Sequence, residues 1–195
     1  MLSEQRKAGF MKRFSVRDLV LIAAMAALGI AIKPIVVPIA HLVSSPLMIP
    51  GGALAGGLYM MWLVVAMGLT DKRGTATMVG VIQALLVMIA GVSGSHGAMS
   101  LLSYTLPGIA MDLGLLILRR RVDNLLSAFI AGILCNMAGT VVVNMIFFTL
   151  PVIPLLLSVF VSAFSGALGG LLSWQLLKAL RRFGIGEKEQ EDEEE

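Results

Sequence analysis

The chain has 195 residues, of which 57% are hydrophobic and 14% are charged, and its mean hydropathy is +0.91. Soluble domains contain roughly 45–50% apolar residues, so the composition excludes a soluble globular protein and indicates an integral membrane protein. The formal net charge is +3, but residues 1–186 carry fourteen basic and five acidic residues. We attribute this basic excess to membrane orientation and not to nucleic-acid binding.

The basic residues alternate with pairs of apolar segments along the chain. Apart from Lys33, every Lys and Arg lies in one of four patches. Because cytoplasmic loops of membrane proteins retain Lys and Arg, the pattern predicts six crossings with both termini in the cytoplasm. The patches are Arg6/Lys7/Lys12/Arg13/Arg17, Lys72/Arg73, Arg119/Arg120/Arg121 and Lys178/Arg181/Arg182/Lys188.

Six apolar segments are candidates for membrane-spanning helices, since about 20 apolar residues cross a hydrocarbon core of about 30 Å. We therefore expect one all-α, six-helix transmembrane domain over residues 1–180, followed by an acidic, disordered cytoplasmic tail over residues 181–195. The predicted spans are residues 18–37, 51–69, 75–91, 99–118, 125–149 and 155–178.

The first outer loop is rich in proline. Proline lacks a backbone donor and interrupts helices, so we expect this segment to lose regular structure near the outer surface and to fold back as a lid that carries His41. Lys33 lies near the outer end of the first span, and its side chain is expected to extend toward the interface. The prolines are Pro34, Pro38, Pro46 and Pro50.

The second outer loop, residues 91–97, contains three glycines, which allow a backbone to approach a ligand closely. Ser93, Ser95 and His96 in this loop are candidates for hydrogen bonds to a small polar molecule. Two histidines, His41 and His96, without neighbouring acids or thiols make a weak metal site. We therefore expect no bound metal.

Two predicted helices carry polar side chains at intervals of four residues, which places each set on one helix face. Unpaired polar groups are costly in hydrocarbon, so both faces should point into the bundle. Tyr59 and Trp62 also share a face, and Gln83 lies near mid-membrane. The two aromatic rings either pack internally or form a stacking platform for a flat heterocycle. The two polar sets are Ser100, Tyr104, Gly108 and Asp112, and Gly132, Asn136, Thr140 and Asn144.

Asp112 is a carboxylate well inside a predicted span, where a charge costs about 2.5–3.5 kcal/mol. It is either a ligand counter-ion or coupling site, or a structural contact, for example to Lys72 or Arg73. Asp112 lies seven residues before Arg119 and is therefore nearer the inner face than the outer loops. This position favours the structural interpretation.

Small residues recur at four-residue intervals and allow helices to approach closely in lipid. Ala23, Ala27 and Ala31 do so on the first span, and a second set does so on the last span. Each set serves either internal packing or contact with another subunit, and the first span, which follows a basic start, suits docking. The second set is Ser158, Ser162, Gly166 and Gly170.

The chain lacks the GxxxxGK[ST] loop that binds ATP, and it lacks the HExxH and GxSxG motifs of hydrolases. These absences exclude ATP hydrolysis by a Walker-type loop and leave the usual hydrolytic chemistries without their groups. We therefore expect a protein that binds a molecule and is not an enzyme, and we expect no cofactor.

Several short segments between residues 18 and 180 are similar to segments of a known protein family and occur in the same order. They are residues 59–62, 72–76, 84–86, 91–94 and 165–168, together with Asp112. In these segments the chain resembles the S components of energy-coupling factor (ECF) vitamin importers, which are ABC transporters of prokaryotic cell membranes. Within that group it is most similar to the YkoE family, which is linked to thiamine and its hydroxymethylpyrimidine precursor.

The resemblance implies a membrane-embedded, high-affinity substrate-binding subunit that captures a small vitamin or precursor from outside. It also implies that Ala23, Ala27 and Ala31 contact the transmembrane coupling subunit, and that two partner ATPase subunits power uptake. The alternative is a stand-alone proton-coupled secondary transporter of a small polar molecule that uses Asp112. The candidate ligand-binding residues are His41, Tyr59, Trp62, Gln83, Ser93, Ser95, His96, Tyr104, Asn136 and Asn144.

Overall fold

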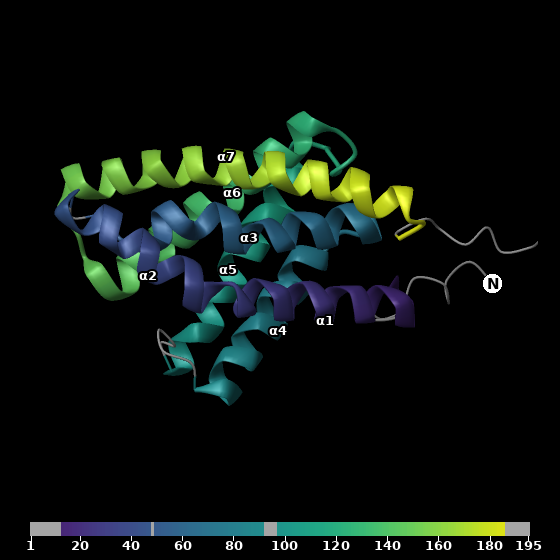
Figure 1. Ribbon diagram of the computed structural model, residues 1–195, viewed down its shortest axis with the longest axis horizontal. Coiled ribbons are helices and arrows are strands. Elements are labelled where there is room, and N and C mark those ends of the chain that lie inside the picture. Colours follow the sequence, from purple (N-terminus) through teal and green to yellow (C-terminus); the bar gives the residue numbers. More distant parts are fainter. Residues whose placement is uncertain (1–12, 48, 92–96, 186–195) are drawn as a thin grey trace, which may run out of the picture.

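The computed structural model describes residues 13–47, 49–91 and 97–185, and all regular structure within these ranges is helical (Figure 1). The acidic tail expected from residue 181 onward lies outside the described residues, apart from its first five positions. The helices are α1 Val16–Ala31, α2 Lys33–Ser44, α3 Gly51–Thr70, α4 Thr75–Ala90, α5 Ser100–Ile117, α6 Leu125–Val143 and α7 Val152–Arg182, with short turns η3 Ser45–Leu47, η4 Gly97–Met99 and the π-turn η5 Asn144–Phe148.

The apolar helices follow the order of the predicted spans. Helices α3, α5, α6 with its π-turn, and α7 are long and apolar enough to cross a membrane, and the bent pair α1 and α2 makes a fifth candidate. Helix α4 has 16 residues and is a shorter apolar helix. At 1.5 Å per residue it is about 24 Å long, against a hydrocarbon core of about 30 Å. The count of six crossings therefore stays a prediction.

The proline-rich segment is helical, contrary to the expectation of irregular structure. Pro34 lies in the first turn of α2, where the missing N–H would have no helical partner, and Pro38 lies inside the helix. Because Pro34 cannot continue the hydrogen-bond ladder of α1, the chain bends by 41° at Ile32 and then resumes as α2. The helix therefore changes direction at this point, and the segment that contains Pro34 and Pro38 remains helical.

The described members of the four basic patches lie at one end of the bundle, where the two ends of the described chain also come together (Figure 1). Arg17 Nη2 donates to the carbonyl of Gly184 at 3.2 Å, and Arg181 Nη2 donates to the carbonyl of Gly68 at 2.8 Å. The loop between α3 and α4 forms two ion pairs, Lys72 with Asp18 of α1 and Asp71 with Arg121 of the loop between α5 and α6. We call this region the basic end; α2 and the start of α7 lie at the opposite end.

Most of the large buried apolar side chains form one cluster from α1, α3, α4, α5, α6 and α7. The capping box of Ser15 and Asp18 begins α1 beside this cluster, with Asp18 Oδ2 accepting from Ser15 N at 2.8 Å. Several members of the cluster have no exposed surface, so the protein is densely packed there. These members include Ile22, Val64, Val65, Val79, Met111 and Leu177.

The small residues on the last span serve internal packing. A Cβ built on Gly132 would lie 2.2 Å from the carbonyl oxygen of Gly166, and one built on Gly166 would lie 2.4 Å from the carbonyl oxygen of Gly132. Helices α6 and α7 therefore touch backbone to backbone at these glycines. The alanine set on α1 differs, because Ala23, Ala27 and Ala31 are all exposed.

The replacement Gly132→Ala is expected to lower the stability of the bundle by about 1–3 kcal/mol, as overpacking does in other well-packed cores. The added methyl group meets backbone atoms, which cannot rotate away. Gly114→Ala is the matched control, because its Cβ meets the flexible end of Leu134 at 2.5 Å. Thermal unfolding in detergent measures both variants, and equal melting temperatures would contradict the close contact.

Candidate ligand-binding site

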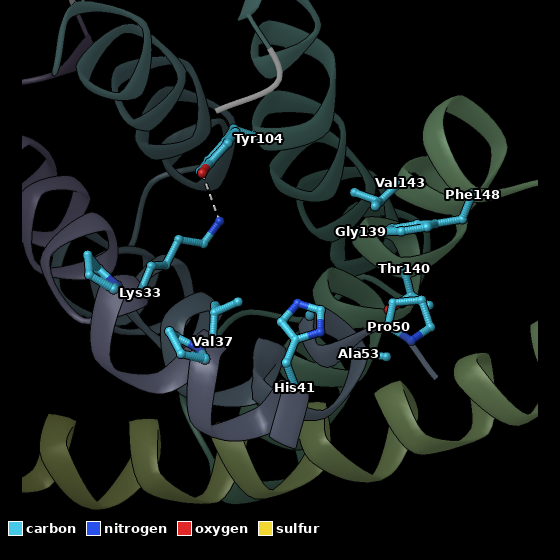
Figure 2. A pocket seen from close by; sticks show the side chains of 13 residues that line it. Lys33, Val37, His41, Pro50, Ala53, Tyr104, Gly139, Thr140, Val143 and Phe148 are labelled. Carbon is cyan, nitrogen blue, oxygen red and sulfur yellow. Dashed lines mark hydrogen bonds between the residues drawn. The ribbon is translucent and has the colours of Figure 1, made fainter. Parts of the chain in front are cut away.

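A cavity of about 480 Å³ lies at the end of the bundle opposite the basic end (Figure 2). This volume falls within the range of about 300–1,000 Å³ that is typical of small-molecule sites. Most of the lining is apolar, and the polar groups are few. The lining residues are Lys33, Pro34, Val37, Pro38, His41, Pro50, Gly52, Ala53, Tyr104, Gly139, Thr140, Val143 and Phe148.

Helix α2 supplies one wall of the cavity, including its charged residue Lys33. Lys33 Nζ donates to the hydroxyl of Tyr104 at 2.9 Å. The same nitrogen lies 4.0 Å from the centroid of the Tyr104 ring and 4.3 Å from that of Tyr59. Lys33 therefore binds two aromatic rings inside the bundle and does not extend to the interface as the sequence suggested. Figure 2 shows this contact at one side of the cavity.

His41 and Tyr104 are the two predicted ligand-binding residues that line the cavity. His41 projects from α2, and its ring packs so closely on Gly51 that a Cβ there would lie 2.7 Å from His41 Cγ. Tyr59 lies behind the wall, where its hydroxyl donates to the carbonyl of Gly52 at 3.1 Å. The rings of Tyr59 and Tyr104 thus position the ammonium group of Lys33.

Four other predicted residues do not line this cavity. Asn136 is 1% exposed, and its Nδ2 donates to the carbonyls of Ala53 at 3.1 Å and Ser162 at 2.8 Å, so it links α6 to α3 and α7. Gln83 is buried, with its Nε2 against Gly29 of α1. Asn144 is buried at the start of the π-turn, and Trp62 packs against the core. Ser93, Ser95 and His96 lie outside the described residues.

The lining residues that the sequence interpretation missed come mainly from the bend and from the end of α6. The prolines were assigned to an irregular loop, whereas Pro34 and Pro38 form part of a helical wall. Phe148 reaches the cavity because the π-turn extends α6 past Val143. The sequence position of Lys33 could have identified it as a site residue. An ionisable residue within a membrane span is a functional-site candidate by default.

Asp112 lies at the basic end, away from the cavity. Its Oδ1 accepts from the backbone N of Gly74 at 3.0 Å, and its Oδ2 accepts from the backbone N and the hydroxyl of Thr77 at 2.8 and 2.6 Å. Gly74 is the N-cap residue of α4 and has no side chain to satisfy the free N–H groups there. Asp112 of α5 therefore caps α4 in place of a local side chain, and contacts with Lys72 or Arg73 are not needed to explain it.

The replacement Asp112→Asn is expected to destabilise the protein by about 1–2 kcal/mol, the usual range for a lost helix cap. An amide keeps one acceptor oxygen where the carboxylate has two, so some bonds to Gly74 and Thr77 are lost. Asp123→Asn is the control, because Asp123 is exposed. Thermal unfolding measures the difference.

The same variant tests the alternative of a stand-alone transporter. Proton-coupled uptake by the isolated chain that is lost in Asp112→Asn would support that alternative.

The described residues contain no group of three or more His, Cys, Asp or Glu side chains that could hold a metal ion. The cavity offers one imidazole, from His41, beside the ammonium group of Lys33. Divalent transition metals require several nitrogen, sulfur or oxygen donors. The described part of the lining is therefore suited to an organic ligand with an apolar body.

Comparison with solved structures finds a chain described as the crystal structure of an S-component of an ECF transporter. The two chains share 18% sequence identity, with a TM-score of 0.74, and the match covers 89% of this chain and 88% of that chain. The protein therefore has an S-component-like fold. A comparison with curated proteins finds no match.

A family model described as the permease component of an ABC-type cobalt transport system matches residues 17–138. This stretch runs from the first turn of α1 into α6 and includes α2, the wall of the cavity that carries Lys33. Since the match extends over more than half of the sequence, the chain belongs to the family of ABC-type cobalt transport system permease components.

Proposed function

We propose that the chain is the substrate-binding S component of an ECF-type ABC importer of a prokaryotic cell membrane, and that it captures a small vitamin or vitamin precursor. The observation that carries this proposal is the 480 Å³ cavity at the end opposite the basic residues. If the basic end lies in the cytoplasm, as the positive-inside rule predicts, the cavity lies on the outer side, where a nutrient arrives. Six crossings, with α4 as a short span, would place both termini inside.

The exposed alanines of α1 are the proposed contact with the transmembrane coupling subunit. Ala23, Ala27 and Ala31 lie four residues apart on a face that no other described helix covers. Small side chains allow a partner helix to approach closely in lipid. The coupling subunit would connect this chain to two ATPase subunits, which fits the absence of a Walker motif in the sequence.

For the ligand, the resemblance to the YkoE family suggests thiamine or its hydroxymethylpyrimidine precursor. The lining supports the second of these molecules in this proposal. The thiazolium ring of thiamine carries a positive charge, which would be repelled by Lys33. The pyrimidine is uncharged and flat, and it could rest on the apolar wall beside Phe148. A cobalt ion, which the name of the family suggests, would also be repelled by Lys33.

The proposed capture function predicts that the protein, purified in detergent, retains a small organic molecule that mass spectrometry detects after denaturation. Re-addition of that molecule should raise the melting temperature and bind with a Kd below about 1 μM, equivalent to roughly −8.2 kcal/mol. Liposomes should take up the ligand only when the coupling and ATPase subunits are present with ATP. Failure of a complete vitamin panel to stabilise the protein, together with an empty extract, would exclude capture.

A further inference from the structure

The carboxylates of the described residues are all engaged at the basic end. Asp18 pairs with Lys72, Asp71 pairs with Arg121, and Asp112 caps α4. The fourth carboxylate, that of Asp123, accepts from the side chains of Asn124 and of Ser127 in the first turn of α6. No acidic side chain among residues 13–47, 49–91 and 97–185 lines the cavity or forms an ion pair with Lys33.

Lys33 is therefore an amine in the cavity wall whose contacts within the described part of the chain are all with neutral groups. Its ammonium group contacts the hydroxyl of Tyr104 and the faces of the Tyr104 and Tyr59 rings. A cation–π contact stabilises a desolvated ammonium by about 2 kcal/mol. The desolvation of a buried charge without a counter-ion costs more, on the order of several kcal/mol. The contacts hold the ammonium in place without neutralising it.

The arrangement leaves hydrogen-bond donors directed at the site. A lysine ammonium has three N–H donors, and the bond to Tyr104 uses one of them. Because the Tyr104 oxygen accepts from Lys33, its own O–H remains available as a donor. Thr140 and His41 also line the cavity. The ammonium of Lys33 and the adjacent O–H of Tyr104 together form a pair of donors of the kind that binds an oxyanion.

We propose that the cavity selects a ligand with an oxyanion group, a carboxylate or a phosphate, which pairs with Lys33 and accepts from Tyr104. The apolar body of the ligand would lie against Pro34, Val143 and Phe148. This inference rests on the proposed function of ligand capture and narrows its ligand class. On this proposal metal cations and thiamine bind less well than anions, and hydroxymethylpyrimidine, which the apolar wall could accommodate, gains the contact with Lys33 only as an ester that carries an acidic group.

The test compares probes that differ in charge but little in shape, using the full chain in lipid nanodiscs. Nicotinate against nicotinamide tests a carboxylate, hydroxymethylpyrimidine phosphate against hydroxymethylpyrimidine tests a phosphate, and thiamine tests a cation. We expect the anionic member to bind at least tenfold more tightly than its neutral counterpart in at least one pair. Equal or tighter binding of the neutral members in both pairs, or tightest binding of thiamine, overturns the oxyanion proposal alone. Absence of binding by every probe counts against the capture function as well.

Variants of Lys33 show whether this residue is the source of the selectivity. Lys33→Met should bring the anion-to-neutral affinity ratio close to one, while Lys33→Arg, which keeps the charge, should retain a preference of at least threefold. Lys33→Met should also melt no lower than the unliganded parent protein, because it removes a buried charge. A lower melting temperature with an unchanged ratio would show that Lys33 is only structural. Tyr104→Phe loses the O–H donor but keeps the ring, so it should lower the affinity for the anionic probes and not for the neutral ones. This variant replaces Lys33→Met in the test if Lys33→Met does not fold.

Discussion

Replacing Val143 with tryptophan is expected to weaken ligand binding by at least about 100-fold, or roughly 2.7 kcal/mol. Val143 lines the cavity from the last turn of α6. An indole ring at this position would occupy space that the ligand needs. The ligand could then bind only if the indole ring moved out of the cavity. Isothermal titration with the co-purified ligand, on protein in nanodiscs, measures the loss.

Met145→Trp is the matched control for this prediction. Met145 lies two residues further along the same segment and is 73% exposed, so an added indole meets lipid or solvent and not the cavity. It should change the ligand affinity less than twofold. If both variants bind like the parent protein while both remain folded by thermal unfolding, the ligand does not use this cavity.

Replacing Ala27 with tryptophan is expected to abolish assembly with the coupling subunit and, with it, ATP-driven uptake. Ala27 is exposed on α1, between Ala23 and Ala31. A large side chain there would hold the partner helix away and remove the close contacts along the whole face. Ligand affinity should be unchanged, because these alanines do not line the cavity. Co-purification of tagged subunits and uptake into liposomes measure the two effects.

Leu168→Trp controls for a general effect of tryptophan on an exposed apolar surface. Leu168 lies on α7 and is 47% exposed. This variant should assemble and transport like the parent protein. Normal assembly of Ala27→Trp with impaired ligand binding would mean that the alanine face serves the ligand site and not the partner.

The order of helices could be predicted from the sequence because apolar length and basic patches are local properties. The predicted loops at residues 70–74 and 119–124 match the structure to within one residue, since charged residues mark them directly. The bend at Ile32 was not predicted. Proline indicates a break in a helix, but whether the chain becomes irregular or resumes as a second helix depends on packing, here of α2 on α3.

The candidate site was harder to predict than the fold. Spacing by four residues places Asn136 and Thr140 on one helix face, yet Thr140 lines the cavity while Asn136 holds three helices together. Periodicity identifies the helix face that points into the bundle. It does not show which positions along that face lie in the packed core and which line the cavity. The contact of Lys33 with Tyr104 joins residues 71 positions apart, which a single sequence does not reveal.

The bend at Ile32 has a consequence for the kinetics of binding. Lys33, Pro34, Val37, Pro38 and His41 all belong to α2, so this part of the wall is one short helix joined to α1 through a single residue. A displacement of this helix about Ile32 would carry all five side chains together and would open the bond between Lys33 and Tyr104. If such a displacement accompanies ligand exchange, association and dissociation share one conformational barrier, which the backbone of the bend helps to set.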